Sequence, residues 1–261
     1  MNFLLTPNKK VYFASDLHLQ MAPDEASRQR EHLFVQWLDS IQTDADIIFL
    51  LGDIFDYWFD YRYVVPRGFV RLLGKLQELT DKGIAIHYFA GNHDMWLRDY
   101  FEVELGITVH RKPEEVRLNN KIFLLGHGHN LGPVTWSERL LNAIFTSKVL
   151  KVPFVAIHPY WTMGFGIRWS KYNRKKHGWV TRFQSIDKEY LALYARKQLK
   201  QKHYDYFIFG HRHLAMEVNL GENSRYINTG EWVNGDTYAV FDGENLKLQS
   251  FRGNTKWLEI S

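Results

Sequence analysis

Residues 50–56 read LLGDIFD, and this stretch decides the fold. It closes a short apolar run, residues 47–51, whose length and composition predict a strand buried on both faces. Gly52 permits a sharp turn, and Asp53 follows at once. Because α/β sheets bind ligands at the carboxyl edge of their strands, we expect Asp53 to be a functional carboxylate; a helix cap is the alternative.

The composition narrows the class of protein. The chain has 261 residues, 45% of them apolar, which is enough for one substantial core. It has no cysteine, so a metal would have to bind His, Asp, Asn or Glu, and the composition is compatible with a reducing cytoplasm. The net charge of +4 favours anionic partners. We find no signal-peptide pattern and no apolar run long enough to span a bilayer.

The hydrophobic pattern predicts alternating strands and helices. Strands are expected at residues 11–15, 47–51, 84–90, 121–125 and 204–209, helices at 25–40, 64–82 and 96–105, and closing antiparallel strands at 226–229 and 238–241. The first two strands flank a helix, so they are expected to be parallel neighbours. Turn signals at Asn234-Gly235 and Asp242-Gly243 support the closing strands.

Residues 131–201 differ from the rest and predict a mainly helical insertion within a single domain, 1–261. The segment is rich in Trp, Phe and Tyr, and four basic residues follow closely at 171–176. Two interpretations stay open for its aromatic side chains. They either pack the core of a subdomain, or they form an apolar groove or lid with a positive rim beside the functional edge.

Five of the expected strands end in Asp, Asn or His, most of them beside a glycine. The candidate metal ligands are Asp16, His18, Asp53, Asn92, His127, His211 and His213. A mixed set of nitrogen and oxygen donors suits Mn²⁺, Fe²⁺, Zn²⁺ or Mg²⁺ rather than Ca²⁺. Seven ligands are too many for one tetrahedral ion and suit two ions, with Asp53 on the central strand as the bridge.

In this order the motifs D-x-H, G-D, G-N-H-D, G-H and G-H-x-H resemble those of the calcineurin-like metallophosphoesterase superfamily. The resemblance implies an α/β fold, a β-sandwich flanked by helices, with the insertion as a cap. It also implies two divalent ions, with Mn²⁺ expected and Mg²⁺, Fe²⁺ or Zn²⁺ as alternatives. By this resemblance the first ion binds Asp16, His18, Asp53 and His213, and the second binds Asp53, Asn92, His127 and His211.

Two positions depart from the superfamily pattern. Tyr57 and Trp58 follow Asp56, which argues against the protein phosphatase branch. His129 stands where the superfamily often has Asp, so the orientation of His127 could be weakened and a pH-sensitive group added.

Residues 52–58 and the long insertion further resemble the UDP-2,3-diacylglucosamine diphosphatase family of lipid A biosynthesis. That resemblance implies hydrolysis of the substrate's pyrophosphate to UMP and 2,3-diacylglucosamine 1-phosphate, with the cap holding the acyl chains. It also implies a cytoplasmic protein that is peripheral on the inner face of the inner membrane. His93 stands where one branch of that family has Arg, which indicates a divergent branch.

The remaining site residues have proposed roles. His93 is the candidate proton donor, with a purely supporting histidine as the alternative, and Asp94 is expected to orient its ring. Asp56 either caps a helix or supports the site. The residues expected to contact substrate are Asn92, His93, Ser170, Asn173 and Lys176.

Two other functions are considered. A phosphoesterase acting on nucleotides or other phosphodiesters would have the same chemistry, but the apolar insertion argues against a soluble nucleotide, and the basic stretch is too short for nucleic acid. A metal-free binding scaffold is disfavoured because all seven ligands are present. The sequence gives no oligomeric state.

Overall fold

The computed structural model describes residues 1–94, 96–132, 156–177 and 183–260, without the side chains of 169–177. One sheet contains β2 (Lys10–Ala14), β3 (Ala45–Leu50), β4 (Ala85–Phe89), β5 (Thr108–His110), β11 (Thr237–Phe241) and β12 (Leu246–Ser250). The other contains β1 (Asn2–Phe3), β6 (Glu114–Leu118), β7 (Lys121–Gly126), β8 (Tyr206–Phe209), β9 (Met216–Gly221), β10 (Ser224–Asn228) and β13 (Leu258–Ile260). The strand orders are β12-β11-β2-β3-β4-β5 and β1-β6-β7-β8-β10-β9-β13.

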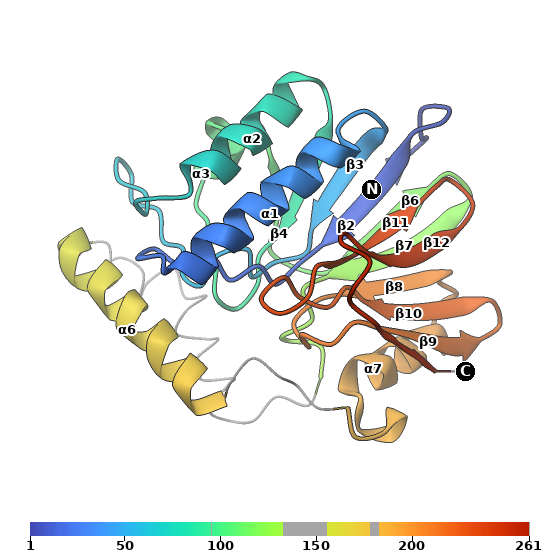
Figure 1. The fold of residues 1–261 in the computed structure, drawn as a ribbon. Coiled ribbons are helices and arrows are strands. Elements are labelled where there is room, and N and C mark those ends of the chain that lie inside the picture. Colours follow the sequence, from blue (N-terminus) through green and yellow to red (C-terminus); the bar gives the residue numbers. More distant parts are fainter. Residues whose placement is uncertain (95, 133–155, 178–182, 261) are drawn as a thin grey trace.

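The helices lie outside the two sheets (Figure 1). They are α1 (Glu25–Ile41), α2 (Val70–Asp81), α3 (Tyr100–Val103), α6 (Pro159–His177) and α7 (Tyr190–Leu199), with a 3₁₀ turn, η1 (Ile186–Lys188). Helices α1 and α2 cover the outer face of the six-stranded sheet, where Trp37 and Leu76 are fully buried. Helix α7 covers the other sheet. The layers are therefore helix, sheet, sheet, helix, which confirms the expected α/β sandwich.

The core between the sheets follows from the alternation of side chains along β2. Val11 and Phe13 face the second sheet, and the ring of Phe13 lies 6.1 Å from that of Phe123 on β7. Tyr12 and Ala14 face the opposite way, toward the layer of α1. Because successive side chains of a strand point to opposite faces, both faces of β2 are buried. β2 and β3 are parallel neighbours, as predicted.

Two helices are shorter than the sequence predicted. Helix α2 begins at Val70 rather than residue 64, because Gly68 and Phe69 before it have left-handed backbone, with φ of 112° and 61°. The expected helix at 96–105 forms only at Tyr100–Val103. Trp96 instead makes a bridge to Phe59, which draws the segment away from helical geometry.

The two closing strands do not pair with each other. β10 is parallel to β8 and antiparallel to β9, whereas β11 pairs with β2 and β12 in the other sheet. The turn at Asp242-Gly243 does join the antiparallel pair β11 and β12. Asn234-Gly235 makes no hairpin, because the chain there crosses from one sheet to the other.

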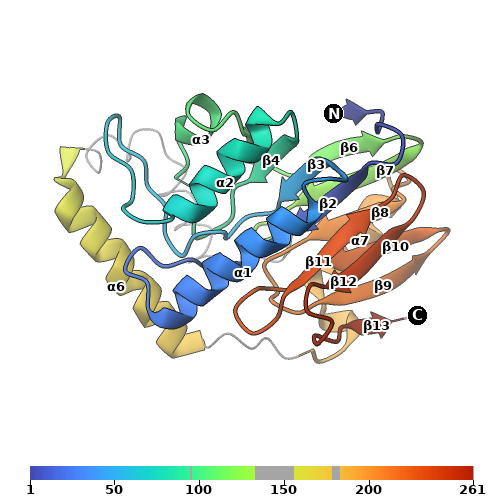
Figure 2. The same cartoon turned by 45° about the horizontal axis from the view of Figure 1, so that its top comes forward.

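The expected insertion is described only in part. Residues 133–155 and 178–182, which include several of its aromatic residues, lie outside the described residues. Helix α6 lies apart from both sheets, near the start of α1 (Figures 1 and 2). It meets the main domain where the hydroxyls of Tyr61 and Thr162 are hydrogen-bonded and where Gly166 lies against the ring of Tyr57.

The end of the expected insertion packs differently from α6. Leu191, Ala192 and Ala195 of α7 are fully buried against the seven-stranded sheet. The boundaries at 131 and 201 stay a prediction. Among the described residues, the structure contains no helix with the length and apolarity needed to cross a membrane.

Candidate metal centre

The candidate site lies where β2, β3, β4, β7 and β8 end. The loops that follow these strands are tied together by backbone hydrogen bonds. The amide of Asp16 donates to the carbonyl of Gly52 at 3.1 Å, and that of His18 donates to the carbonyl of Asp53 at 3.0 Å. Parallel strands thus deliver side chains from distant parts of the sequence to one edge.

Five of the seven expected ligands have left-handed backbone. The φ values are 57° at Asp16, 49° at His18, 52° at Asp53, 68° at His211 and 50° at His213. Asp16 and His18 therefore do not lie on extended chain, although they closely follow a strand. A non-glycine residue in this region costs about 1–3 kcal/mol, and such residues cluster at functional sites.

Three glycines allow these loops to approach one another. A methyl group on Gly52 would lie 2.7 Å from Nδ1 of His127, and one on Gly91 would overlap the carboxylate of Asp53. A methyl group on Gly210 would overlap the side chains of Ser15 and Asp16. The glycines that follow the strands are thus needed for close contact as well as for turning.

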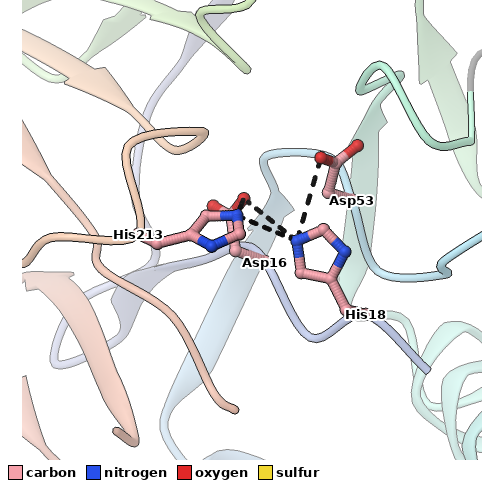
Figure 3. A group of neighbouring side chains, drawn as sticks. All are labelled: Asp16, His18, Asp53 and His213. Atoms are coloured by element: carbon pink, nitrogen blue, oxygen red, sulfur yellow. Dashed lines mark hydrogen bonds and ion pairs between the residues drawn. The ribbon is translucent and has the colours of Figure 1, made fainter. Parts of the chain in front are cut away.

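The first group contains Asp16, His18, Asp53 and His213 (Figure 3). The Nε2 atoms of His18 and His213 are 2.9 Å apart, and His213 Nε2 lies 3.2 Å from Asp16 Oδ1. Asp16 Oδ1 is buried and accepts no hydrogen bond. Imidazole nitrogens that converge with a carboxylate oxygen left without a hydrogen bond match the donor set of a divalent cation.

The second group contains Asp53, His127 and His211. His127 Nε2 is 3.2 Å from Asp53 Oδ2, 3.2 Å from Asn92 Oδ1 and 3.2 Å from His211 Nδ1. On the other side of its ring, Nδ1 of His127 donates to the carbonyl of Leu51 at 2.8 Å, which directs Nε2 at the other donors of the group. Asp53 belongs to both groups, so the donors fit a pair of ions that shares this carboxylate.

The two aspartates are held ionised. Burial alone would raise the pKa of Asp16, but the adjacent imidazoles of His18 and His213 lower it well below its usual range. Burial likewise opposes the charge of Asp53, and the adjacent His127 outweighs that effect and lowers the pKa. Although burial lowers the pKa of His18, the nearby carboxylates of Asp16 and Asp56 raise it to about 10. The edge therefore concentrates negative potential, which favours a cation.

Asp56 positions two histidines of the site, the candidate ligand His18 and its neighbour His93. Its Oδ1 lies 3.2 Å from Nδ1 of His18, so Asp56 supports the site instead of capping a helix. Its carbonyl oxygen accepts a hydrogen bond from Nδ1 of His93 at 3.0 Å. The amide of His93 donates to Asp53 Oδ1 at 2.9 Å, which places the ring 4.9 Å from that of His18.

Asp94 does not orient the His93 ring, contrary to our expectation. Its carboxylate accepts hydrogen bonds from the amides of Gly91 at 2.7 Å and Ile54 at 2.9 Å, and from the hydroxyl of Tyr88. Asp94 is fully buried. It thus joins the loop after β3 to the loop after β4, and the ring of His93 is held by the carbonyl of Asp56.

His129 adds a further imidazole to the second group. Its ring lies 5.4 Å from that of His127 and 6.2 Å from that of His211. Burial and the neighbouring His127 lower the pKa of His129 to about 3, so it is neutral at physiological pH. The orientation of His127 comes from the carbonyl of Leu51 and needs no carboxylate at position 129.

Three expected substrate contacts cannot be placed in space. Ser170, Asn173 and Lys176 belong to α6, but their side chains lie outside the described residues. The other two, Asn92 and His93, lie at the candidate metal centre.

Three further residues, Ser15, Thr229 and Tyr88, support the candidate site and were not predicted from the sequence. The Ser15 hydroxyl is hydrogen-bonded to Asp16 and lies 2.7 Å from the hydroxyl of Thr229. The sequence does contain a signal for Thr229. It directly follows β10 and stands beside Gly230, in the same way that the candidate ligands follow other strands beside a glycine. Tyr88 lies inside a strand, and nothing in its surrounding sequence distinguishes it from a core residue.

Comparison with known proteins finds related sequences and structures. A UDP-2,3-diacylglucosamine hydrolase from Porphyromonas gingivalis is 40% identical over 254 residues, covering 92% of this chain and 97% of the relative. A second protein of that name, from Hahella chejuensis, is 26% identical over 55% of this chain and 57% of its own length. Among solved structures, a phosphoesterase from E. coli has a TM-score of 0.47 and 17% identity, covering 94% of this chain and 95% of its own.

The profile of the calcineurin-like phosphoesterases matches residues 9–215. That range includes every strand-end loop that supplies a candidate ligand. The chain is a member of the calcineurin-like phosphoesterase family.

Proposed function

We propose that this protein hydrolyses the pyrophosphate of UDP-2,3-diacylglucosamine, releasing UMP and 2,3-diacylglucosamine 1-phosphate. The observation that carries the proposal is the convergence of two donor groups that share Asp53, at the edge of a calcineurin-like fold. The substrate is supported by the Porphyromonas gingivalis relative, which matches along nearly its whole length and carries that substrate in its name.

Two divalent ions are proposed, with Mn²⁺ as the expected metal. One would be held by Asp16, His18, Asp53 and His213, and the other by Asp53, Asn92, His127 and His211. When bound, such ions lower the pKa of a water molecule to near neutrality and offset charge on phosphoryl oxygens.

His93 is proposed to move a proton in this reaction. Its Nδ1 donates to the carbonyl of Asp56, so in the doubly protonated ring Nε2, on the other side, is the atom that gives up a proton to the leaving oxygen and becomes neutral. The amide of His93 is held by Asp53, which keeps the ring beside the ligands. Asp94 is proposed to act on catalysis only through the loops that it joins.

Helix α6 is proposed to hold the acyl chains and to contact the membrane surface. Tyr160 and Trp161 are 72% and 68% exposed, which is unusual for aromatic side chains of this size. The basic residues at 171–176 follow them on the same helix, and together these features suit a helix that lies on an anionic lipid surface. With that role we propose a cytoplasmic location, peripheral on the inner face of the inner membrane.

The test is an assay of UMP release from UDP-2,3-diacylglucosamine in detergent micelles. We expect activity with Mn²⁺, loss of activity after chelation, and recovery when Mn²⁺ is returned. A panel of nucleotides and simple phosphodiesters serves as the comparison. Faster turnover of that panel than of the glycolipid would replace the proposed substrate, and purified protein that binds no divalent metal would point to a binding scaffold.

A further inference from the structure

Arg212 lies between two candidate ligands, and its side chain is engaged on the far side of their loop. Both neighbours, His211 and His213, have left-handed backbone. The amide of Arg212 donates to the carbonyl of Gly210 at 2.8 Å, and the amide of Gly210 donates to the carbonyl of His127 at 3.0 Å. A change in the position of Arg212 should therefore change the backbone conformation of the two histidines beside it.

The side chain of Arg212, which is partly exposed, forms an ion pair with the buried carboxylate of Glu189. Its Nε lies 3.0 Å from Oε1 and 3.1 Å from Oε2 of Glu189. Glu189 is only 1% exposed, and it directly precedes α7. A buried carboxylate needs a positive partner. Because Nε of Arg212 is hydrogen-bonded to both oxygens of Glu189, the contact should restrict rotation of both side chains.

The next two residues of α7 contact the same loops. The ring of Tyr190 lies under the guanidinium of Arg212, at 5.7 Å, and fills the space beside Gly132. Leu191 is fully buried, and a methyl group on Gly128 would lie 3.1 Å from its Cδ1. Gly128 directly follows His127. Three consecutive residues thus support both loops that supply histidines to the second donor group.

This support is anchored in the main domain. Leu191, Ala192 and Ala195 belong to the same buried cluster as Phe207 and Phe209 of β8, the strand that leads into the His211 loop. Glu189 also follows η1, so it lies where the chain returns from the expected insertion. The packing of α7 therefore connects the loops that carry the candidate ligands to the end of the expected insertion.

We propose that Glu189 and Arg212 are positioning residues of the metal centre. Through their ion pair, the first turn of α7 holds His211 and His213 in their left-handed conformations. The inference rests on the proposed function, since it assumes that these histidines bind metal. Neither Glu189 nor Arg212 touches the reacting atoms.

The test measures Mn²⁺ binding by calorimetry without substrate. Glu189→Gln keeps the size of the side chain but removes its charge. Loss of a residue that orients metal ligands typically costs 10–100-fold in metal affinity, so we expect a rise in the Mn²⁺ dissociation constant of about that size. High Mn²⁺ should restore kcat, and the KM for the glycolipid should stay unchanged.

A second ion pair between Glu and Arg, in the seven-stranded sheet, serves as the control. Glu217 pairs with Arg225 at 2.5 Å, between β9 and β10. Glu217→Gln should leave Mn²⁺ affinity unchanged, whatever its effect on thermal stability. If Glu189→Gln lowers only the melting temperature, as this control does, the positioning role is wrong.

Two further variants complete the test. Arg212→Lys keeps the charge but removes Nε, so it should weaken Mn²⁺ binding less than Glu189→Gln, and it replaces Glu189→Gln if that variant does not fold. The double variant Glu189→Gln/Arg212→Gln should bind Mn²⁺ no more weakly than the worse single variant, because both changes break one interaction. Additive losses would contradict a shared role.

The outcome for the wild-type protein separates this inference from the proposed function. Wild-type protein that binds no Mn²⁺ overturns both. Mn²⁺ binding that depends on Glu189, without release of UMP from the glycolipid, supports the positioning role and rejects the proposed substrate.

Discussion

The strand edge and helix α6 are built in opposite ways. At the edge, Asp16, His18 and Asp53 are almost fully buried, and each contacts several partners. On α6, Tyr160 and Trp161 are mostly exposed, and the described contacts of the helix with the main domain are made at Thr162 and Gly166.

The difference indicates that the two regions have different roles. A site that must bring charged groups together needs neighbours that fix every side chain, and parallel strand ends provide them. A surface that binds a lipid needs exposed apolar area more than fixed geometry. Changes at the edge should therefore alter the rate of the chemical step, whereas changes on α6 should alter binding of the lipid substrate.

The largest effect is expected for Asp53→Asn. Asp53 belongs to both donor groups, so its loss should lower Mn²⁺-dependent UMP release to background, on the order of a thousandfold or more. Activity and melting temperature are measured together, with Asp81→Asn at the exposed end of α2 as the control. Near-normal turnover by Asp53→Asn would show that the shared carboxylate is not part of the reaction.

His93→Ala should have the next largest effect. A positioned proton donor contributes about 10²–10⁴-fold, so kcat should fall by that factor. Mn²⁺ affinity should remain close to the wild-type value, because His93 is outside both four-ligand sets. If metal affinity falls in parallel with kcat, His93 supports the ligands and does not transfer the proton.

Changes on α6 should separate binding from chemistry. Replacing Tyr160 and Trp161 with Ser removes two aromatic side chains, whose partial burial against lipid should contribute about 1.5–3 kcal/mol together. We expect KM for the glycolipid to rise about 10–100-fold. Hydrolysis of a short, water-soluble phosphodiester should not change.

Leu193→Ser on α7 is the control for α6. Leu193 is 43% exposed and lies on the helix that covers the seven-stranded sheet. It should leave both substrates unaffected. An equal loss with the soluble substrate in the α6 variant would mean that α6 shapes the metal centre itself.

The smallest expected effect is on the stability of the fold in acid. It concerns His87, which belongs neither to the strand edge nor to α6. Burial and the adjacent His110 lower the pKa of His87 to about 4, and the two rings are hydrogen-bonded at 3.0 Å. The unfolded chain binds this proton near pH 6.5, so the contribution of His87 is complete above that pH and is lost as the pH falls toward about 4.

The measurement is urea unfolding at pH 7 and pH 5. Wild-type protein should lose about 1–2 kcal/mol more over this range than His87→Gln. The exposed His203, changed to Gln, is the control and should behave as wild type. Identical pH dependence of His87→Gln and wild type would assign the acid sensitivity to the metal edge.

The local pattern predicted the main strands and the ligand types for clear physical reasons. A buried parallel strand must be apolar along its whole length, so residues 47–51 could be recognised without any partner. A polar residue directly after such a strand has few places to lie other than the sheet edge. Asp53 and His127 could be inferred in this way, and the motif order then indicated the family.

Other features depend on residues far apart in the chain and could not be predicted. β10 and β11 are consecutive strands of the chain, yet each joins a different sheet, since that choice is made by pairing with β8 and β2. The helix predicted from residue 64 begins at Val70 because the backbone before it is left-handed.

By itself, the sequence determined which residue types stand at the strand ends, because strand burial and glycine placement are local properties. Only the tertiary structure decided how those residues are held. The left-handed backbone at five candidate ligands and the carbonyl of Asp56 that holds His93 come from contacts between loops. The ion pair of Glu189 with Arg212 spans more than twenty residues, and no local pattern specifies such a contact.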